Sequence, residues 1–263
     1  MHSVWPVEEI MKSILFSQPS KRYTAAVIII MLRVYSSDEK GRRYYQLDDF
    51  MLSLRYVSNC DRSYSCSLTA PVDMTEAIAF ARSQKNRTTV TAMVVRASAM
   101  ALEHNPILAG RWLDRIDRVY VPEKEEARIF LPVQVGDFSN GVWLERPFKK
   151  SLSEIAEELN REVKAVKDKS KGNLFYPEPF LAISNVGTLG MIENASATLT
   201  GDVVSELVIC SIIEKPWVVN DKIEARKIMN LVVGWDHFAV LASTPAEFLT
   251  EVKDLLEHPG RLE

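Results

Sequence analysis

The chain has 263 residues, of which 47% are hydrophobic and 25% charged, and its formal net charge is −3 at pH 7. This composition is typical of an ordinary globular protein with one large or two small domains. The small net charge gives no global field that would recruit nucleic acid or an anionic membrane, and no segment reaches the roughly 20 apolar residues of a membrane span.

The cysteines indicate the compartment. Cys60, Cys66 and Cys210 form neither a metal-binding spacing nor an even, paired framework. We therefore expect a reducing compartment and no bound metal. The acidic Glu8 and Glu9 near the start do not fit a signal-peptide layout, so the expected location is the cytoplasm.

The first 43 residues are predicted to be an N-terminal extension. They contain one expected strand, Tyr23–Tyr35, between two turn-rich stretches. Residues 44–263 are predicted to form one catalytic domain, because they contain no long linker, no repeat and no low-complexity tract.

Apolar residues at helical spacing predict helices, and three of them have recognisable start signals. Ser151 and Glu154 form a capping box, and Thr244 before Pro245 looks like an N-cap followed by a proline at the first helical position. The predicted helices are Asp73–Arg82, Thr88–His104, Ser151–Val166 and Thr244–Leu256.

Runs of β-branched and apolar residues predict strands between these helices. The expected strands are Ser65–Val72, Val119–Val121, Arg128–Val135, Phe180–Asn185, Glu206–Ile213 and Lys227–Val240. Because strands and helices do not alternate strictly, the expected fold is an α/β (α+β) sandwich in which helices pack on one side of a mixed sheet.

His237 is the first candidate catalytic residue. It follows an apolar, β-branched run, which places it at the end of a predicted strand and just before a predicted helix. Asp236, the preceding residue, can interact with the backbone or with the histidine ring. A histidine in this setting can take a proton from a thiol or hydroxyl near neutral pH. Read by itself, however, a single histidine in a strand-rich segment is as well explained by a structural role.

Ser184 is the second candidate. It lies in the segment from Phe180 to Gly187, where a hydroxyl at a strand end could stabilise an oxyanion while His237 acts as the base. A thiol needs only a modest base, so this pair suffices for acyl transfer between thiols without a covalent serine. No Gly-x-Ser-x-Gly elbow supports a hydrolase triad, and a polar turn closing a strand is the alternative interpretation.

These two segments, Ile183–Gly187 and Trp235–His237, resemble the acyltransferase catalytic domain of 2-oxo-acid dehydrogenase complexes, which is similar in fold to chloramphenicol acetyltransferase. The resemblance runs from about Leu47 to Leu262. Its other segments are Ser67–Thr75, His104–Pro106, Phe130–Val135, Ser151–Ala156 and Ala246–Pro259.

The resemblance implies a chloramphenicol acetyltransferase-like homotrimer, or a higher assembly of trimers, with active sites between subunits. His237 of one subunit would be the general base and Ser184 of its neighbour the oxyanion donor. Coenzyme A would be a substrate, and the acyl acceptor would enter from the other side. The family's lipoyl domain has no counterpart in this sequence, so a separate acyl carrier or a dehydrogenase-complex partner is implied.

The histidine motif departs from the family's pattern Asp-His-Arg-x-x-Asp-Gly. Phe238 replaces the arginine, Leu241 the second aspartate and Ala242 the glycine. A leucine can neither accept a hydrogen bond nor pair with a charge, so one support of the site is missing. Two hypotheses therefore stay open: a coenzyme A-dependent acyltransferase, and a catalytically inactive relative that serves as a trimeric scaffold or partner-binding subunit.

Overall fold

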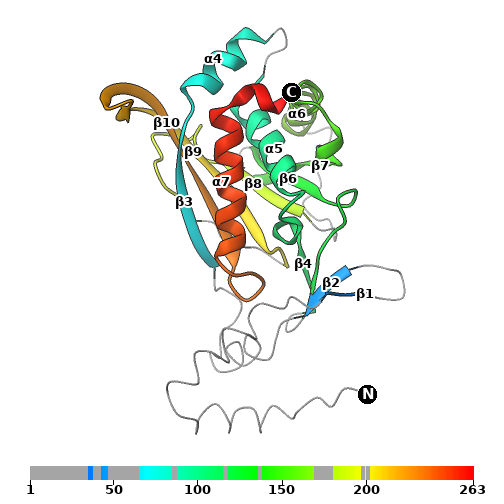
Figure 1. Cartoon of the computed structure of the whole chain (residues 1–263). Coiled ribbons are helices and arrows are strands. Elements are labelled where there is room, and N and C mark those ends of the chain that lie inside the picture. Colours follow the sequence, from blue (N-terminus) through cyan, green and yellow to red (C-terminus); the bar gives the residue numbers. More distant parts are fainter. Residues whose placement is uncertain are drawn as a thin grey trace, which may run out of the picture.

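The fold consists of a large mixed sheet with helices on one face and a small second sheet (Figure 1). The computed structural model describes residues 35–37, 43–46, 65–84, 88–114, 118–135, 138–168, 180–196, 199 and 202–263. The predicted strand Tyr23–Tyr35 lies outside these residues except for Tyr35, and so does Cys60. The predicted domain boundary between residues 43 and 44 stays a prediction. A short strand, β2 (Arg43–Gln46), runs across it.

The elements follow one another along the chain in this order. They are β1 Tyr35–Ser37, β2 Arg43–Gln46, β3 Ser65–Asp73, α4 Thr75–Ser83, α5 Val90–Ala101, η1 Pro106–Ala109, β4 Arg111–Asp114, β5 Arg118–Tyr120, β6 Arg128–Val135, β7 Phe138–Glu145, η2 Pro147–Lys149, α6 Leu152–Lys167, β8 Phe180–Asn185, β9 Ser205–Val219, β10 Lys222–Asp236, α7 Ser243–Glu257 and η3 Pro259–Leu262.

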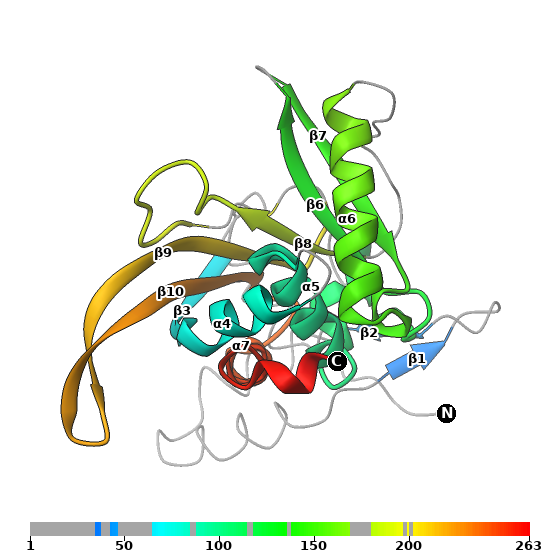
Figure 2. The ribbon, with the colours of Figure 1, turned by 90° about the horizontal axis from the view of Figure 1, so that it is seen from above.

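The small sheet has the strand order β1-β2-β5-β4, and the large sheet has the order β3-β10-β9-β8-β6-β7. Strand β8 pairs in parallel with β6 and β9, whereas the other pairs are antiparallel. Figure 2 shows α4, α5 and α7 on one side of this sheet, with α6 beside β6 and β7. This arrangement confirms the predicted mixed sheet with helices on one side.

The core lies between the sheet and these helices. Alternation along β8 turns Leu181 and Ile183 into the core, where they are 0% and 1% exposed, and it turns Ser184 to the opposite face. Phe248 of α7 and Ile155 of α6 are fully buried from the helix side. The face of the sheet that carries Ser184 therefore has no helix among the described residues.

Several element boundaries differ from the sequence-based expectation: β9 runs to Val219 and not to Ile213, and β10 begins at Lys222 and not at Lys227. Strand β10 ends at Asp236 rather than Val240, because the backbone turns there. Helix α7 begins at Ser243, so Thr244 lies buried in its first turn and is not an N-cap. The prediction that Thr244 is the N-cap was therefore wrong.

Strands β9 and β10 extend past their neighbours as a long hairpin, which projects from the sheet in Figure 1. Its tip residues Asn220 and Asp221 have positive φ angles of 49° and 62°, as a two-residue type I′ turn requires. Near the tip, the paired Val218 and Ile223 are 68% and 78% exposed. No helix in the described part of the chain is both long and apolar enough to cross a membrane.

Helix α6 gives a direct test of the local sequence signals. The Ser151 hydroxyl accepts from the Glu154 backbone N–H, and the Glu154 carboxylate accepts from the Ser151 backbone N–H at 2.7 Å. Ser151→Ala is expected to lower the free energy of unfolding by about 1 kcal/mol, because one helical N–H loses its partner. Urea denaturation measures this loss. Ser153→Ala is the control, because Ser153 lies two residues after Ser151 on the exposed face of the helix. It should change the free energy of unfolding by less than about 0.5 kcal/mol.

Candidate functional site

His237 stands one residue beyond the end of β10, on a tight turn. The carbonyl oxygen of Asp236 accepts from the backbone N–H groups of Ala239 at 3.0 Å and Val240 at 3.2 Å. These bonds bend the chain away from the sheet, so the histidine side chain sits at the sheet's end and not within it. The predicted position of His237 at a strand end is thus what the structure has.

The histidine ring is half-buried, and its two nitrogens differ. The Nδ1 atom is buried and has no hydrogen-bond partner among the described residues. The Trp235 ring lies edge-on with its centroid 6.3 Å from that of the imidazole. Because Nδ1 faces the protein, Nε2 is the nitrogen left to exchange a proton with a bound molecule.

The Asp236 carboxylate builds the turn. Its Oδ1 atom accepts from the Phe238 backbone N–H at 2.9 Å, and its Oδ2 atom accepts from the Trp112 indole N–H at 3.1 Å. Of the two roles that the sequence left open for Asp236, the backbone role is therefore the one observed. Sequence reasoning did not connect Trp112 with Asp236, since nothing in the pattern of residues links β4 to the end of β10.

The three departures from the family pattern also lie on or near this turn. Phe238 is half-buried and packs against the core, Leu241 is 36% exposed, and Ala242 has helical backbone angles directly before α7. An apolar side chain thus occupies the position where the family pattern has its second aspartate.

Ser184 lies near the end of β8, on the sheet face without helices. Its side chain is half-buried, and no described residue hydrogen-bonds to its hydroxyl. The hydroxyl is therefore available to a group that approaches this face of the sheet, as an oxyanion donor requires.

Asn185 and Gly187 hold the end of β8 in place. The Asn185 side chain donates to the Thr91 hydroxyl in the first turn of α5 at 2.9 Å and accepts from the Gly187 backbone N–H at 3.0 Å. A Cβ atom on Gly187 would stand 2.4 Å from the carbonyl oxygen of Cys210, so only glycine fits this close approach. These contacts make the segment after Ser184 a fixed turn.

The two candidate residues do not meet within one chain. Ser184 aligns with Val208 on β9, and Val208 aligns with Val232 on β10, so Ser184 lies five residues short of His237 and two strands away. Strand geometry converts this offset into roughly 16 Å along the strands and roughly 10 Å across them. A site that uses both residues would therefore need two copies of the chain.

Glu206 is a further polar group on the sheet face of Ser184. It lies on β9 between Ala182 of β8 and Gly234 of β10, two small neighbours that leave room around its side chain. Burial removes water from the carboxylate and raises the pKa of Glu206 from 4.5 to about 7. The sequence analysis did not single out this residue, although a glutamate inside an apolar strand was a visible signal.

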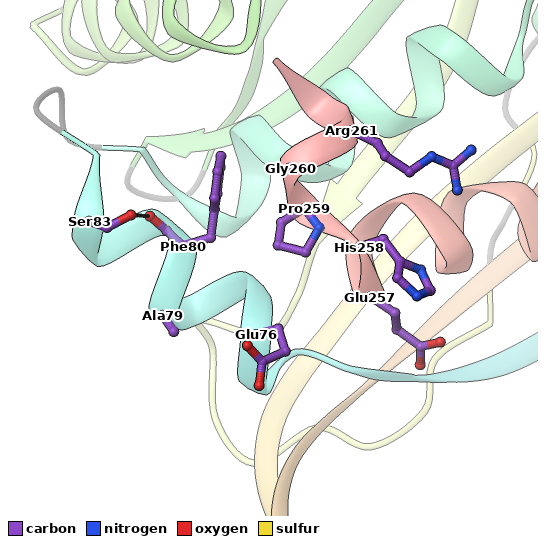
Figure 3. A pocket seen from close by; sticks show the side chains of 9 residues that line it. All are labelled: Glu76, Ala79, Phe80, Ser83, Glu257, His258, Pro259, Gly260 and Arg261. Carbon is purple, nitrogen blue, oxygen red and sulfur yellow. Dashed lines mark hydrogen bonds between the residues drawn. The ribbon is translucent and has the colours of Figure 1, made fainter.

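An open hollow on the surface lies elsewhere (Figure 3). It is lined by Glu76 and Phe80 of α4 and by His258 and Pro259 at the C-terminal end. Helix α7 separates it from the His237 turn by about 22 Å, so it is not part of the candidate site. No cluster of three or more His, Cys, Asp or Glu that could hold a metal occurs in the described residues.

Comparison with known proteins identifies related sequences. The family model described as 2-oxoacid dehydrogenases acyltransferase (catalytic domain) matches residues 48–263. The lipoamide acyltransferase component of the branched-chain alpha-keto acid dehydrogenase complex of Pseudomonas aeruginosa is 28% identical over 189 residues, which are 68% of this chain and 41% of that protein. The dihydrolipoyllysine-residue acetyltransferase component of the pyruvate dehydrogenase complex of Rickettsia conorii is 29% identical over 204 residues, 75% of this chain and 47% of that protein. This chain thus spans less than half the length of either relative.

Solved structures of the same fold are also similar. The dihydrolipoamide acetyltransferase of Azotobacter vinelandii matches with a TM-score of 0.68 at 19% identity, over 81% of this chain and 88% of that one. Its crystallographic and enzymatic investigation concerned a serine, a histidine and an asparagine in the catalytic mechanism. The cubic core of a pyruvate dehydrogenase multienzyme complex matches with a TM-score of 0.66 at 18% identity, over 81% and 88% of the two chains. A chloramphenicol acetyltransferase matches with a TM-score of 0.57 at 14% identity, over 79% and 94%.

The burial of Glu206 predicts a pH-dependent stability. In the unfolded chain its carboxyl ionises near 4.5, whereas in the folded chain it stays protonated up to about 7. Between these two pH values only the unfolded state loses the proton, so the free energy of unfolding falls as the pH rises. Above pH 7 the total decrease in this free energy is up to about 3 kcal/mol. Glu206→Gln is therefore expected to be more stable than the wild type at pH 8 and equally stable at pH 4.

Thermal melting at the two pH values measures this difference. Glu214→Gln changes an exposed glutamate on the same strand and serves as the control for loss of a negative charge. If Glu206→Gln raises the melting temperature no more at pH 8 than at pH 4, the Glu206 carboxyl is ionised and solvated in the folded protein.

Proposed function

The chain belongs to the family of 2-oxoacid dehydrogenase acyltransferase catalytic domains, and from this we propose that it is an acyltransferase that moves an acyl group between coenzyme A and a thiol or other acceptor. The observation that carries the proposal is the fixed turn after β10, which presents His237 with a buried Nδ1 and leaves Nε2 for the substrate. The serine and histidine studied in the Azotobacter enzyme support the choice of residue types.

The proposed reaction needs only a base and an oxyanion donor. The His237 Nε2 atom takes the proton of the acceptor thiol, and the resulting sulfur attacks the carbonyl carbon of the acyl thioester. The Ser184 hydroxyl donates a hydrogen bond to the oxyanion of the tetrahedral intermediate. When the intermediate collapses, the carbon–sulfur bond to coenzyme A breaks and the imidazolium returns the proton to the departing thiolate.

We further propose that the working unit is a homotrimer, or a higher assembly of trimers. Within one chain the two residues lie roughly 16 Å apart along the strands, so a neighbouring copy must supply one of them. The sheet face that carries Ser184 has no helix among the described residues, and a second copy could approach there. A separate acyl carrier or dehydrogenase-complex partner would present the acceptor, as the names of the relatives suggest.

An inactive scaffold is the second candidate function. The observation in its favour is the apolar Leu241, 36% exposed, where the family pattern has an aspartate. The two functions differ in one measurable property: an acyltransferase loses turnover when His237 is replaced, whereas a scaffold has no turnover to lose.

Replacing His237 is the first test. His237→Ala is expected to lower turnover at least about 100-fold, because the acceptor thiol loses its base. The measurement is thiol release from a panel of acyl-coenzyme A donors with thiol or amine acceptors. His104→Ala is the control, since this histidine is 72% exposed at the end of α5 and should leave turnover unchanged. Turnover that survives in His237→Ala, or none in the wild type across the panel, would favour the scaffold.

Mixed assemblies test whether the site is shared between subunits. Ser184→Ala is also expected to lower turnover by about 100-fold, because the oxyanion loses its donor. If the two residues come from different subunits, co-expressed His237→Ala and Ser184→Ala chains form some intact sites. Random mixing into trimers predicts about a quarter of wild-type activity. Mixtures no more active than either single variant would place both groups in one chain or show that Ser184 is not needed.

A further inference from the structure

We infer that Trp112 is a positioning residue for His237 and acts through the carboxylate of Asp236. The inference rests on the proposed function for its catalytic consequence, but its structural part concerns only the turn itself. It adds to the proposed reaction a residue that belongs to the small sheet, on β4, and touches no substrate.

The contact between Trp112 and Asp236 uses a different carboxylate oxygen from the contact with Phe238. The indole Nε1–H donates to Oδ2 at 3.1 Å, while Oδ1 accepts from the Phe238 backbone N–H at 2.9 Å. Hydrogen bonds to an ionised acceptor are stronger than neutral ones and constrain its orientation. The carboxylate is thus fixed from one side by the indole and fixes, from its other side, the backbone that follows His237.

Trp112 is itself held firmly. Its side chain is 5% exposed, and its backbone N–H donates to the carbonyl oxygen of Asp202 at 2.8 Å. Backbone hydrogen bonds also connect Val204 to the segments on both sides of it. The Val204 N–H donates to the carbonyl oxygen of Gly110 at 3.2 Å, and the Asp236 N–H donates to the carbonyl oxygen of Val204 at 2.9 Å. The segments that carry Trp112 and Asp236 are therefore both hydrogen-bonded to residues 202–204, and this restrains the contact between the two side chains.

A second indole supports the far side of the turn. The Trp235 Nε1–H donates to the carbonyl oxygen of Val240 at 3.1 Å. The two tryptophans thus bracket His237, one at the start of the turn and one at its end. Neither Phe238 nor Leu241 carries a charged group, and both of these hydrogen bonds to the turn come from neutral indole donors.

Trp112→Phe tests the inference, because it removes the N–H and keeps an aromatic ring. We expect kcat to fall about tenfold while KM for the acyl donor stays within about twofold, since a loosened His237 affects the chemical step and not binding. Asp236→Asn breaks the same contact from the other side, because its amide donates where Oδ2 accepts. The double variant should be no worse than the more damaged single variant, as expected for two residues that act through one bond.

Hydrogen exchange supplies a readout that does not depend on turnover. The peptide that contains the Phe238 amide is expected to exchange faster in Trp112→Phe than in the wild type, because its acceptor is no longer fixed. Trp217→Phe makes the same chemical change on the distant hairpin and should alter neither kcat nor this exchange. Melting temperatures identify a variant that merely unfolds, in which case exchange would rise across all peptides.

The outcomes separate the two proposals. Unchanged exchange at Phe238 in Trp112→Phe, or additive losses of kcat in the double variant, would overturn the role of Trp112. A wild type without turnover would overturn the proposed function, and faster exchange confined to the turn would then still support the positioning of His237 by Trp112.

Discussion

The carboxylate of Asp236 is the point at which the two sheets and the candidate catalytic turn meet. It ends the last strand of the large sheet, accepts from Trp112 of the small sheet and fixes the backbone of Phe238. Two hydrogen-bond donors hold this half-buried carboxylate, and the loss of either donor would leave one of its oxygens less well paired. The placement of His237 follows from this arrangement.

The sheet with helices on one face only is the second constraint. Its inner face forms the core with α5, α6 and α7, and its outer face carries Ser184 and the protonated Glu206. A carboxyl that remains neutral up to about pH 7 is tolerated there without a cation, which an ionised one would not be. Apolar packing and polar chemistry are thus separated by the alternation of residues along the same strands.

Much of this fold could be predicted from the sequence, because the signals are local. The limits of β6 and β8 follow from short, mainly apolar runs, and the capping box sets the start of α6. Strand β4 was missed because it has only four residues, and β7 was missed because its residues alternate too weakly and Gly141 interrupts it. The contact of Trp112 with Asp236 joins residues 124 positions apart, and no local pattern reports such a pair.

The projecting hairpin of β9 and β10 has a consequence for how the chain avoids aggregation. Beyond the end of β3, the outer edge of β10 pairs with no other strand in the described part of the chain, and it ends in exposed apolar side chains. Such a ribbon would readily recruit further strands into an open-ended stack. If a second ribbon lay beside it in register, like charges of the two ribbons would face each other. The charged residues concerned include Glu214, Lys215, Glu224 and Arg226. Repulsion between these like charges therefore opposes the growth of fibres from the hairpin.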